Sequence, residues 1–150
     1  MVHTVFGVGP ADHEAEQVLD LGIGQAHPSA RVLPERAELA AVYRRAALVL
    51  LPSEREGFGL PLAEAMACGT PVIASAIPSL LEVGGSAVTY CAPEDLNAWV
   101  TAVLQFLRQR DEDPDRWEVR RQQSVQSAAR FDWRTYAAEM TRMYQAVCTS

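Results

Sequence analysis

Residues 52–75 read Pro-Ser-Glu-Arg-Glu-Gly-Phe-Gly-Leu-Pro-Leu-Ala-Glu-Ala-Met-Ala-Cys-Gly-Thr-Pro-Val-Ile-Ala-Ser, a pattern that predicts a turn, a short helix and then a strand. The preceding run, residues 46–51, is continuously apolar, which is typical of a strand buried on both faces of a parallel sheet. Pro52 ends that strand. Pro61 suits the first position of a helix, because its missing N–H costs nothing there, and Gly69 closes the helix. The pattern predicts a β-α-β unit.

The same alternation continues on both sides of this unit. A chain of 150 residues with 49% hydrophobic content can bury one core. We therefore predict an α/β fold, a Rossmann-like parallel sheet flanked by helices. A short turn is expected at residues 80–83. The expected strands are residues 4–8, 31–33, 46–51, 71–74 and 87–90, and the expected helices are residues 11–21, 35–45, 61–69, 96–110, 117–129 and 133–147.

The corner between the strand and the helix has the composition of a ligand site. Two carboxylates flank a Gly-Phe-Gly turn, and glycine allows the backbone to turn sharply and to approach a ligand closely. The first turn of a helix presents unpaired N–H groups and a partial positive charge, which can hold a phosphate or a polar sugar. The candidate residues are Glu56, Gly57, Phe58, Gly59, Leu60 and Glu64.

This arrangement resembles the donor site of retaining glycosyltransferases of the GT-B architecture, specifically the group 1 or family 4 enzymes, which pair two glutamates separated by seven residues. The resemblance covers residues 4–147, and residues 38–75 are its most specific part. It implies a transferase of carbohydrate biosynthesis that moves a sugar, with retention, from a nucleoside diphosphate donor to an acceptor hydroxyl.

The resemblance also implies roles for single residues. Glu56 is the catalytic candidate, because the matching glutamate orients the donor sugar near the reacting carbon. Glu64 corresponds to the residue that holds the ribose hydroxyls, and the amides of residues 57–60 correspond to donor-binding groups. Val32 and Leu33 match the place where the nucleobase meets the backbone, although Pro34 replaces the usual glycine there.

In domain organisation, residues 1–150 correspond to the C-terminal, nucleotide-sugar-binding half of such an enzyme, truncated at its N-terminus. The matching family members begin this half with a strand and helix whose Arg and Lys neutralise the diphosphate, and they carry a preceding domain that binds the sugar, lipid or other hydroxyl acceptor. The sequence has thirteen arginines and no lysine, so it offers no lysine-based phosphate clamp. We expect the isolated chain to be inactive in sugar transfer.

Composition narrows the other possibilities. A formal charge of −6 without any basic block argues against nucleic acid as a partner. No apolar run approaches the roughly 20 residues of a membrane span, and no signal peptide is visible, so we expect a cytoplasmic protein without a transmembrane segment. The three cysteines have no metal-like spacing and the histidines have no ligand-like pairing, so we expect no metal and no cofactor.

Plainer interpretations remain open for each feature. Glu56 can be a loop carboxylate favoured by a helix N-terminus, and Glu64 a solvated helix residue. At the level of function, the alternatives are a non-catalytic nucleotide-sugar-binding module or inactive fragment, and a GT-B epimerase or sugar phosphorylase. The last helix carries an apolar stripe that the preceding domain of the resembling family would cover in part, so we expect the isolated chain to self-associate. The members of the stripe are Trp133, Tyr136, Ala137, Met140, Met143, Tyr144 and Val147.

Overall fold

The computed structural model describes residues 4–6 and 36–148. Its four-stranded sheet has the order β1-β2-β3-β4. The last three of these strands are parallel to one another, as predicted. The strands are β1 (Thr4–Phe6), β2 (Leu48–Leu51), β3 (Val72–Ser75) and β4 (Thr89–Cys91).

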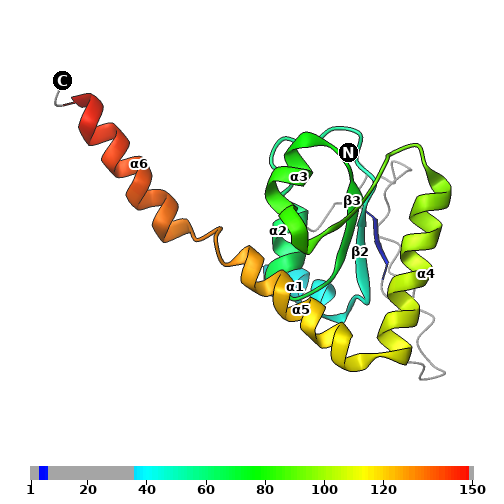
Figure 1. Cartoon of the computed structure of the whole chain (residues 1–150). Helices are drawn as coiled ribbons and strands as arrows, with labels where there is room; N and C mark the ends of the chain where they lie inside the picture. The colour runs from blue at the N-terminus through cyan, green and yellow to red at the C-terminus, as the bar shows by residue number, and fades with distance from the viewer. Residues whose placement is uncertain (1–3, 7–35, 149–150) are drawn as a thin grey trace, which may run out of the picture.

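Helices cover both faces of this sheet (Figure 1). In the view of Figure 1, α4 covers one face, while α1, α2 and α3 cover the other. The expected turn at residues 80–83 is a full helix followed by one 3-10 turn. The elements are α1 (Arg36–Arg45), α2 (Leu60–Ala67), α3 (Pro78–Gly84), η1 (Gly85–Ala87), α4 (Leu96–Glu112), α5 (Pro114–Ala128) and α6 (Trp133–Cys148).

Alternate residues of β2 enter two different hydrophobic clusters. Val49 and Leu51 pack with α2 and α3, whereas Leu48 packs with α4. Successive side chains of a strand point to opposite faces, so a run with no polar residue fits a strand that is covered on both sides. The prediction of a doubly buried strand before the corner is confirmed.

One expectation about the sheet is wrong. The strand predicted at residues 4–8 was assigned to the parallel sheet, but β1 pairs antiparallel with β2, with Val5 opposite Val49. An apolar pattern shows that a segment is extended but carries no information about its direction, which the connecting chain sets. The predicted helix at residues 11–21 and the predicted strand at residues 31–33 lie outside the described residues.

The buried face of α4 is centred on its aromatic side chains. The apolar residues at helical spacing include Leu96, Val100 and Leu104, yet these three are exposed. Trp99 and Phe106 face the sheet instead, and the Trp99 indole N–H donates to the Ala92 carbonyl at 3.0 Å. A large aromatic side chain removes more apolar surface from water than a leucine does, so the aromatic residues take the inner face.

The break between α4 and α5 is tighter than predicted. Asp113 ends α4 and caps α5, because its carboxylate accepts a hydrogen bond from the Arg116 amide at 3.0 Å. Pro114 then occupies the first helical position, where proline is favoured. As a result α5 begins at residue 114 rather than at residue 117.

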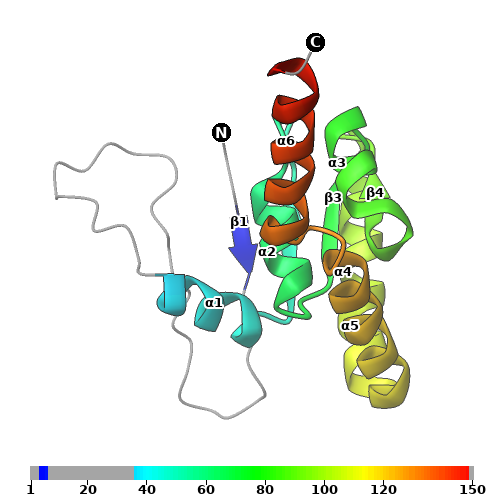
Figure 2. The same ribbon diagram turned by 90° about the vertical axis from the view of Figure 1, so that its left-hand side faces the viewer.

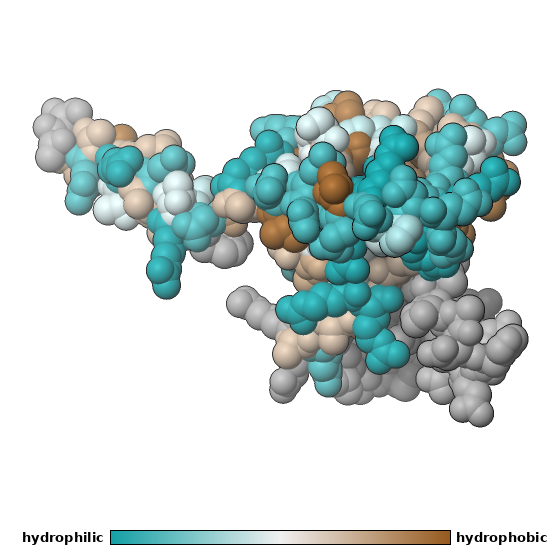
Figure 3. Space-filling view, turned by 60° about the horizontal axis from the view of Figure 1, so that its bottom comes forward, coloured by the Kyte–Doolittle hydropathy of each residue, from teal (hydrophilic) through white to brown (hydrophobic). Residues whose placement is uncertain are grey.

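Helix α6 projects away from the rest of the molecule in Figure 1, and Figure 2 views the molecule from the side on which this helix lies. The space-filling view in Figure 3 shows the same projecting arm from another side. Much of its apolar stripe is therefore exposed, with Tyr136 at 56%, Met143 at 62% and Val147 at 76% of their full accessible area. Within the described ranges, no helix is both long and apolar enough to cross a membrane.

Candidate functional site

The two predicted glutamates lie near the edge of the sheet where its parallel strands end. Residues 52–59 connect the end of β2 to the start of α2, and β3 ends at Ser75 beside β2. In open α/β sheets, ligands bind outside the carboxyl ends of the strands. We call residues 52–64 the corner, and its location agrees with a ligand site.

Gly59 makes the sharp turn of the corner. It precedes α2 with φ 82° and ψ 42°, in the left-handed region that favours glycine. Helix α2 begins at Leu60, one residue earlier than predicted, so Pro61 is its second residue and not its first. Because the first N–H groups of a helix have no partner within the helix, those at the start of α2 can donate to a ligand.

Gly57 has a different environment from Gly59. Its φ is not positive, and no described atom lies within 4 Å of the point where a Cβ would be. A Cβ on Gly59, by contrast, would lie 2.6 Å from Cδ2 of Leu80. Gly59 is thus required by the fold, whereas the space beside Gly57 is open to a ligand. The expectation that both glycines shape the turn holds only for Gly59.

Glu56 is held by a neighbouring hydroxyl. Ser53 is buried, and its Oγ donates a hydrogen bond to Glu56 Oε1 at 2.9 Å. Hydrogen bonds to a charged acceptor are stronger than those between neutral groups. This contact fixes the direction of a partly buried carboxylate without satisfying all of its acceptor sites, which number about four in an ionised carboxylate.

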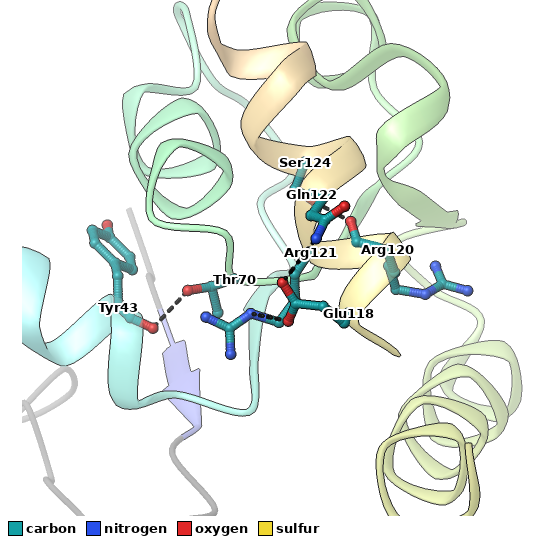
Figure 4. Close-up of polar contacts among 7 residues, drawn as sticks. All are labelled: Tyr43, Thr70, Glu118, Arg120, Arg121, Gln122 and Ser124. Carbon is teal, nitrogen blue, oxygen red and sulfur yellow. Dashed lines mark hydrogen bonds and ion pairs between the residues drawn. The ribbon is translucent and has the colours of Figure 1, made fainter. Parts of the chain in front are cut away.

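Glu64 also accepts a hydrogen bond from a hydroxyl, which belongs to a residue on a different helix. Tyr43 in α1 is only 4% exposed, and its hydroxyl lies 3.2 Å from Glu64 Oε2. The backbone of Tyr43 is fixed as well, because Thr70 Oγ1 donates to its carbonyl oxygen at 2.6 Å (Figure 4). Glu64 itself is exposed on α2, so its carboxylate can be reached from solvent.

Burial raises the pKa of Tyr43 well above its ordinary value, and the negative charge of Glu64 together with the hydrogen bond to it raises that pKa further. The hydroxyl therefore keeps its proton at neutral and mildly alkaline pH. It therefore acts as a donor to Glu64 throughout that pH range.

Phe58 lies at the tip of the corner and is half exposed. Its ring meets Phe131 edge to face with the centroids 5.7 Å apart. The Arg130 guanidinium lies over Phe131 at 4.7 Å and donates to the carbonyls of Glu82 and Val83 at the end of α3. Phe58 is therefore a packing residue, and its amide is the group that remains available for a ligand.

The structure thus places Glu56 in the loop before α2 and Glu64 at the fifth position of that helix. Val32 and Leu33, predicted to meet a nucleobase, lie outside the described residues. Sequence reasoning missed Ser53 and Tyr43. A tyrosine on the inner side of a helix needs a partner for its hydroxyl, and this requirement is the signal that could have identified Tyr43.

Other places in the described ranges offer less chemistry. No group of three or more His, Cys, Asp or Glu side chains gathers there in a way that could hold a metal ion. A shallow hollow between η1 and α5 has no charged lining; its residues are Ser86, Ala87, Gln123, Gln126 and Ser127. A second hollow, whose lining includes Cys68, Glu118 and Arg121, lies at the C-terminal end of α2, away from the carboxyl ends of the strands. The corner is therefore the candidate site.

Comparison with known proteins finds glycosyltransferases. A sequence model described as glycosyl transferases group 1 matches residues 2–109, which include the whole corner. O-antigen chain mannosyltransferase B of Escherichia coli is 35% identical over 109 residues. D-inositol 3-phosphate glycosyltransferase 1 of Catenulispora acidiphila is 34% identical over 137 residues. The solved structure of sucrose-phosphate synthase from Thermosynechococcus elongatus superposes with a TM-score of 0.65 at 33% identity.

The chain spans only a part of each of these proteins. The alignments cover 72% of this chain but 27% of the mannosyltransferase, and 90% of this chain but 32% of the inositol phosphate enzyme. The match to sucrose-phosphate synthase covers 75% of this chain and 28% of that protein.

Proposed function

Because this chain belongs to the glycosyl transferases group 1 family, we propose that it binds a nucleoside diphosphate sugar and that the whole protein transfers this sugar to an acceptor hydroxyl. We propose retention of configuration at the anomeric carbon. The observation that carries the proposal is the corner, where Glu56 and Glu64 flank the start of α2 at the carboxyl edge of a parallel sheet.

The proposed roles follow from the chemistry of each group. Glu56, held by Ser53, accepts hydrogen bonds from donor-sugar hydroxyls and stabilises positive charge that develops at the anomeric carbon. Glu64 accepts from the ribose hydroxyls. The N–H groups around residues 57–60 face the phosphates and the sugar, because the helix N-terminus favours an anion.

The leaving diphosphate needs positive charge. Fixed cations in a closed cleft stabilise such a leaving group most effectively. This chain can offer arginine but no lysine: Arg55 lies within the corner, and Arg44 and Arg45 precede it in the sequence. We propose that the cations and the acceptor site come in part from another region of a longer protein, as the share of each relative that is matched supports.

A binding panel on this chain tests the donor site. We expect a nucleoside diphosphate among UDP, GDP and ADP to bind with a Kd of about 1 mM, or about −4 kcal/mol. Glu64→Gln should weaken that binding at least about tenfold, since a lost charged hydrogen bond costs roughly 1.5–3 kcal/mol. Amide chemical-shift titrations measure both values.

Glu112→Gln is the matched control, because Glu112 is an exposed glutamate at the end of α4. It should bind like the unmodified chain. If none of the three nucleotides shifted any amide of the corner, the proposed donor site would be wrong. Binding without any effect of Glu64→Gln would leave a nucleotide site but contradict the role of Glu64.

We also propose that the isolated chain self-associates through α6, whose exposed residues include Met143 and Val147. Light scattering over a concentration series should show a mass that rises with concentration. Met143→Glu should lower the association, whereas Gln145→Glu, which adds the same charge to the same helix, should have less effect. A strict monomer at all concentrations would contradict this proposal.

A further inference from the structure

Tyr43 occupies an unusual position relative to the proposed donor site. It belongs to α1, which precedes the site in the sequence, and its ring lies in the hydrophobic cluster shared with α2 and β2. Its hydroxyl lies 3.2 Å from Oε2 of the exposed Glu64. The buried Tyr43 thus donates a hydrogen bond to an exposed carboxylate.

Both ends of Tyr43 are fixed. Its ring is almost fully buried, and its carbonyl accepts a hydrogen bond from Thr70, which is 2% exposed in the loop between α2 and β3. A side chain constrained in this way has one position for its hydroxyl. Glu64, by contrast, is an exposed glutamate whose three side-chain torsions are free unless a contact holds them.

The hydrogen bond from Tyr43 uses only part of the Glu64 carboxylate. The Tyr43 hydroxyl occupies one lone pair of the carboxylate and leaves the remaining acceptor sites for a ligand, of which an ionised carboxylate has about four in all.

We infer that Tyr43 is a positioning residue of the nucleotide site: it holds the Glu64 carboxylate in the direction that accepts the ribose hydroxyls. This inference rests on the proposed role of Glu64. It adds a residue that makes no contact with the nucleotide itself and acts by removing the ordering cost that Glu64 would otherwise meet on binding.

The test is a double-mutant cycle on the full chain. Tyr43→Phe removes only the hydroxyl, and Glu64→Ala removes its acceptor. We expect Tyr43→Phe to weaken binding of UDP, GDP or ADP, whichever binds most tightly, by about three- to tenfold. In the Glu64→Ala background the same change should have no further effect. Glu64→Asp, which withdraws the carboxylate by one methylene, should resemble Tyr43→Phe.

Inorganic pyrophosphate is the probe that separates positioning from structure. It has no ribose, so Tyr43→Phe should leave its binding unchanged if the hydroxyl acts through Glu64. An equal loss for pyrophosphate and nucleotide, or a further loss in the Glu64→Ala background, would show that Tyr43 has a merely structural role and would overturn the inference. A nucleotide affinity unchanged by Tyr43→Phe would overturn it as well.

The outcomes also distinguish this inference from the function on which it rests. If the unmodified chain binds no nucleotide, the proposed function fails and the inference fails with it. If the nucleotide binds but Glu64→Ala has no effect, the nucleotide site stands, whereas the role of Glu64 and the inference both fail. If Glu64→Ala weakens binding and Tyr43→Phe does not, the proposed function stands and only the role of Tyr43 is wrong.

Discussion

Gly59→Ala should lower the free energy of unfolding by about 2–4 kcal/mol. Two costs add at this position. An alanine at φ 82° is strained, and its Cβ would lie 2.6 Å from Cδ2 of Leu80. Leu80 is fully buried, so it cannot move aside without repacking the core between α2 and α3. Thermal denaturation should show a Tm lowered by about 5–15 °C.

Gly57→Ala is the matched control for this change. The described structure leaves open space where its Cβ would lie, so the stability should change by less than about 0.5 kcal/mol. The same control separates folding from function, because a Cβ at residue 57 would occupy the space proposed for the ligand. Equal stability losses from the two substitutions would mean that the corner does not turn at Gly59 as described.

The sequence predicted those parts of the fold that local patterns specify. The apolar run before Pro52 required a strand covered on both faces, and the glycines and prolines after it placed the helix of the corner to within one or two residues. These features depend on few neighbours, so the chain itself reveals them. The resemblance to a glycosyltransferase family rested on the same short stretch, and the family model that matches residues 2–109 confirms it.

Other features depend on partners far away in the sequence. The direction of β1 is not encoded in its apolar residues, and the inner face of α4 depends on which side chains fill the space against the sheet. The contact between Tyr43 and Glu64 joins residues 21 positions apart on two helices. No local spacing predicts such a contact, because it arises only when both helices pack on the same strands.

The two hydroxyl contacts give the two carboxylates different environments. Ser53 and Glu56 share one loop, so their hydrogen bond moves with the corner. Tyr43 and Glu64 join two helices, so their contact is set by the packing of the core. Glu56 is proposed to act at the reacting carbon, and Glu64 is proposed to bind the nucleotide. A carboxylate held within a loop fits the first role, and a carboxylate held by the packed core fits the second.

Glu56→Gln should therefore lower sugar transfer by about 10- to 100-fold while it largely spares binding of the free nucleotide. The reason is that the carboxylate of Glu56 is proposed to contact the donor sugar and to stabilise charge that exists only as the bond breaks. The measurement requires a complete enzyme. We expect no transfer from the 150-residue chain alone and measurable transfer when it is joined to the N-terminal part of a group 1 relative.

Glu54→Gln is the control in that hybrid, since Glu54 is an exposed carboxylate two residues away in the same loop. It should leave both turnover and nucleotide binding unchanged. Ser53→Ala should lower sugar transfer less than Glu56→Gln does and more than Glu54→Gln does. It removes the hydrogen bond that orients Glu56 but keeps the charge of that carboxylate. Rapid transfer of a labelled sugar by the chain alone would contradict the proposal that the cations and the acceptor site come in part from another region of a longer protein. Equal losses from Glu54→Gln and Glu56→Gln would show that loop charge, rather than one oriented carboxylate, supports the reaction.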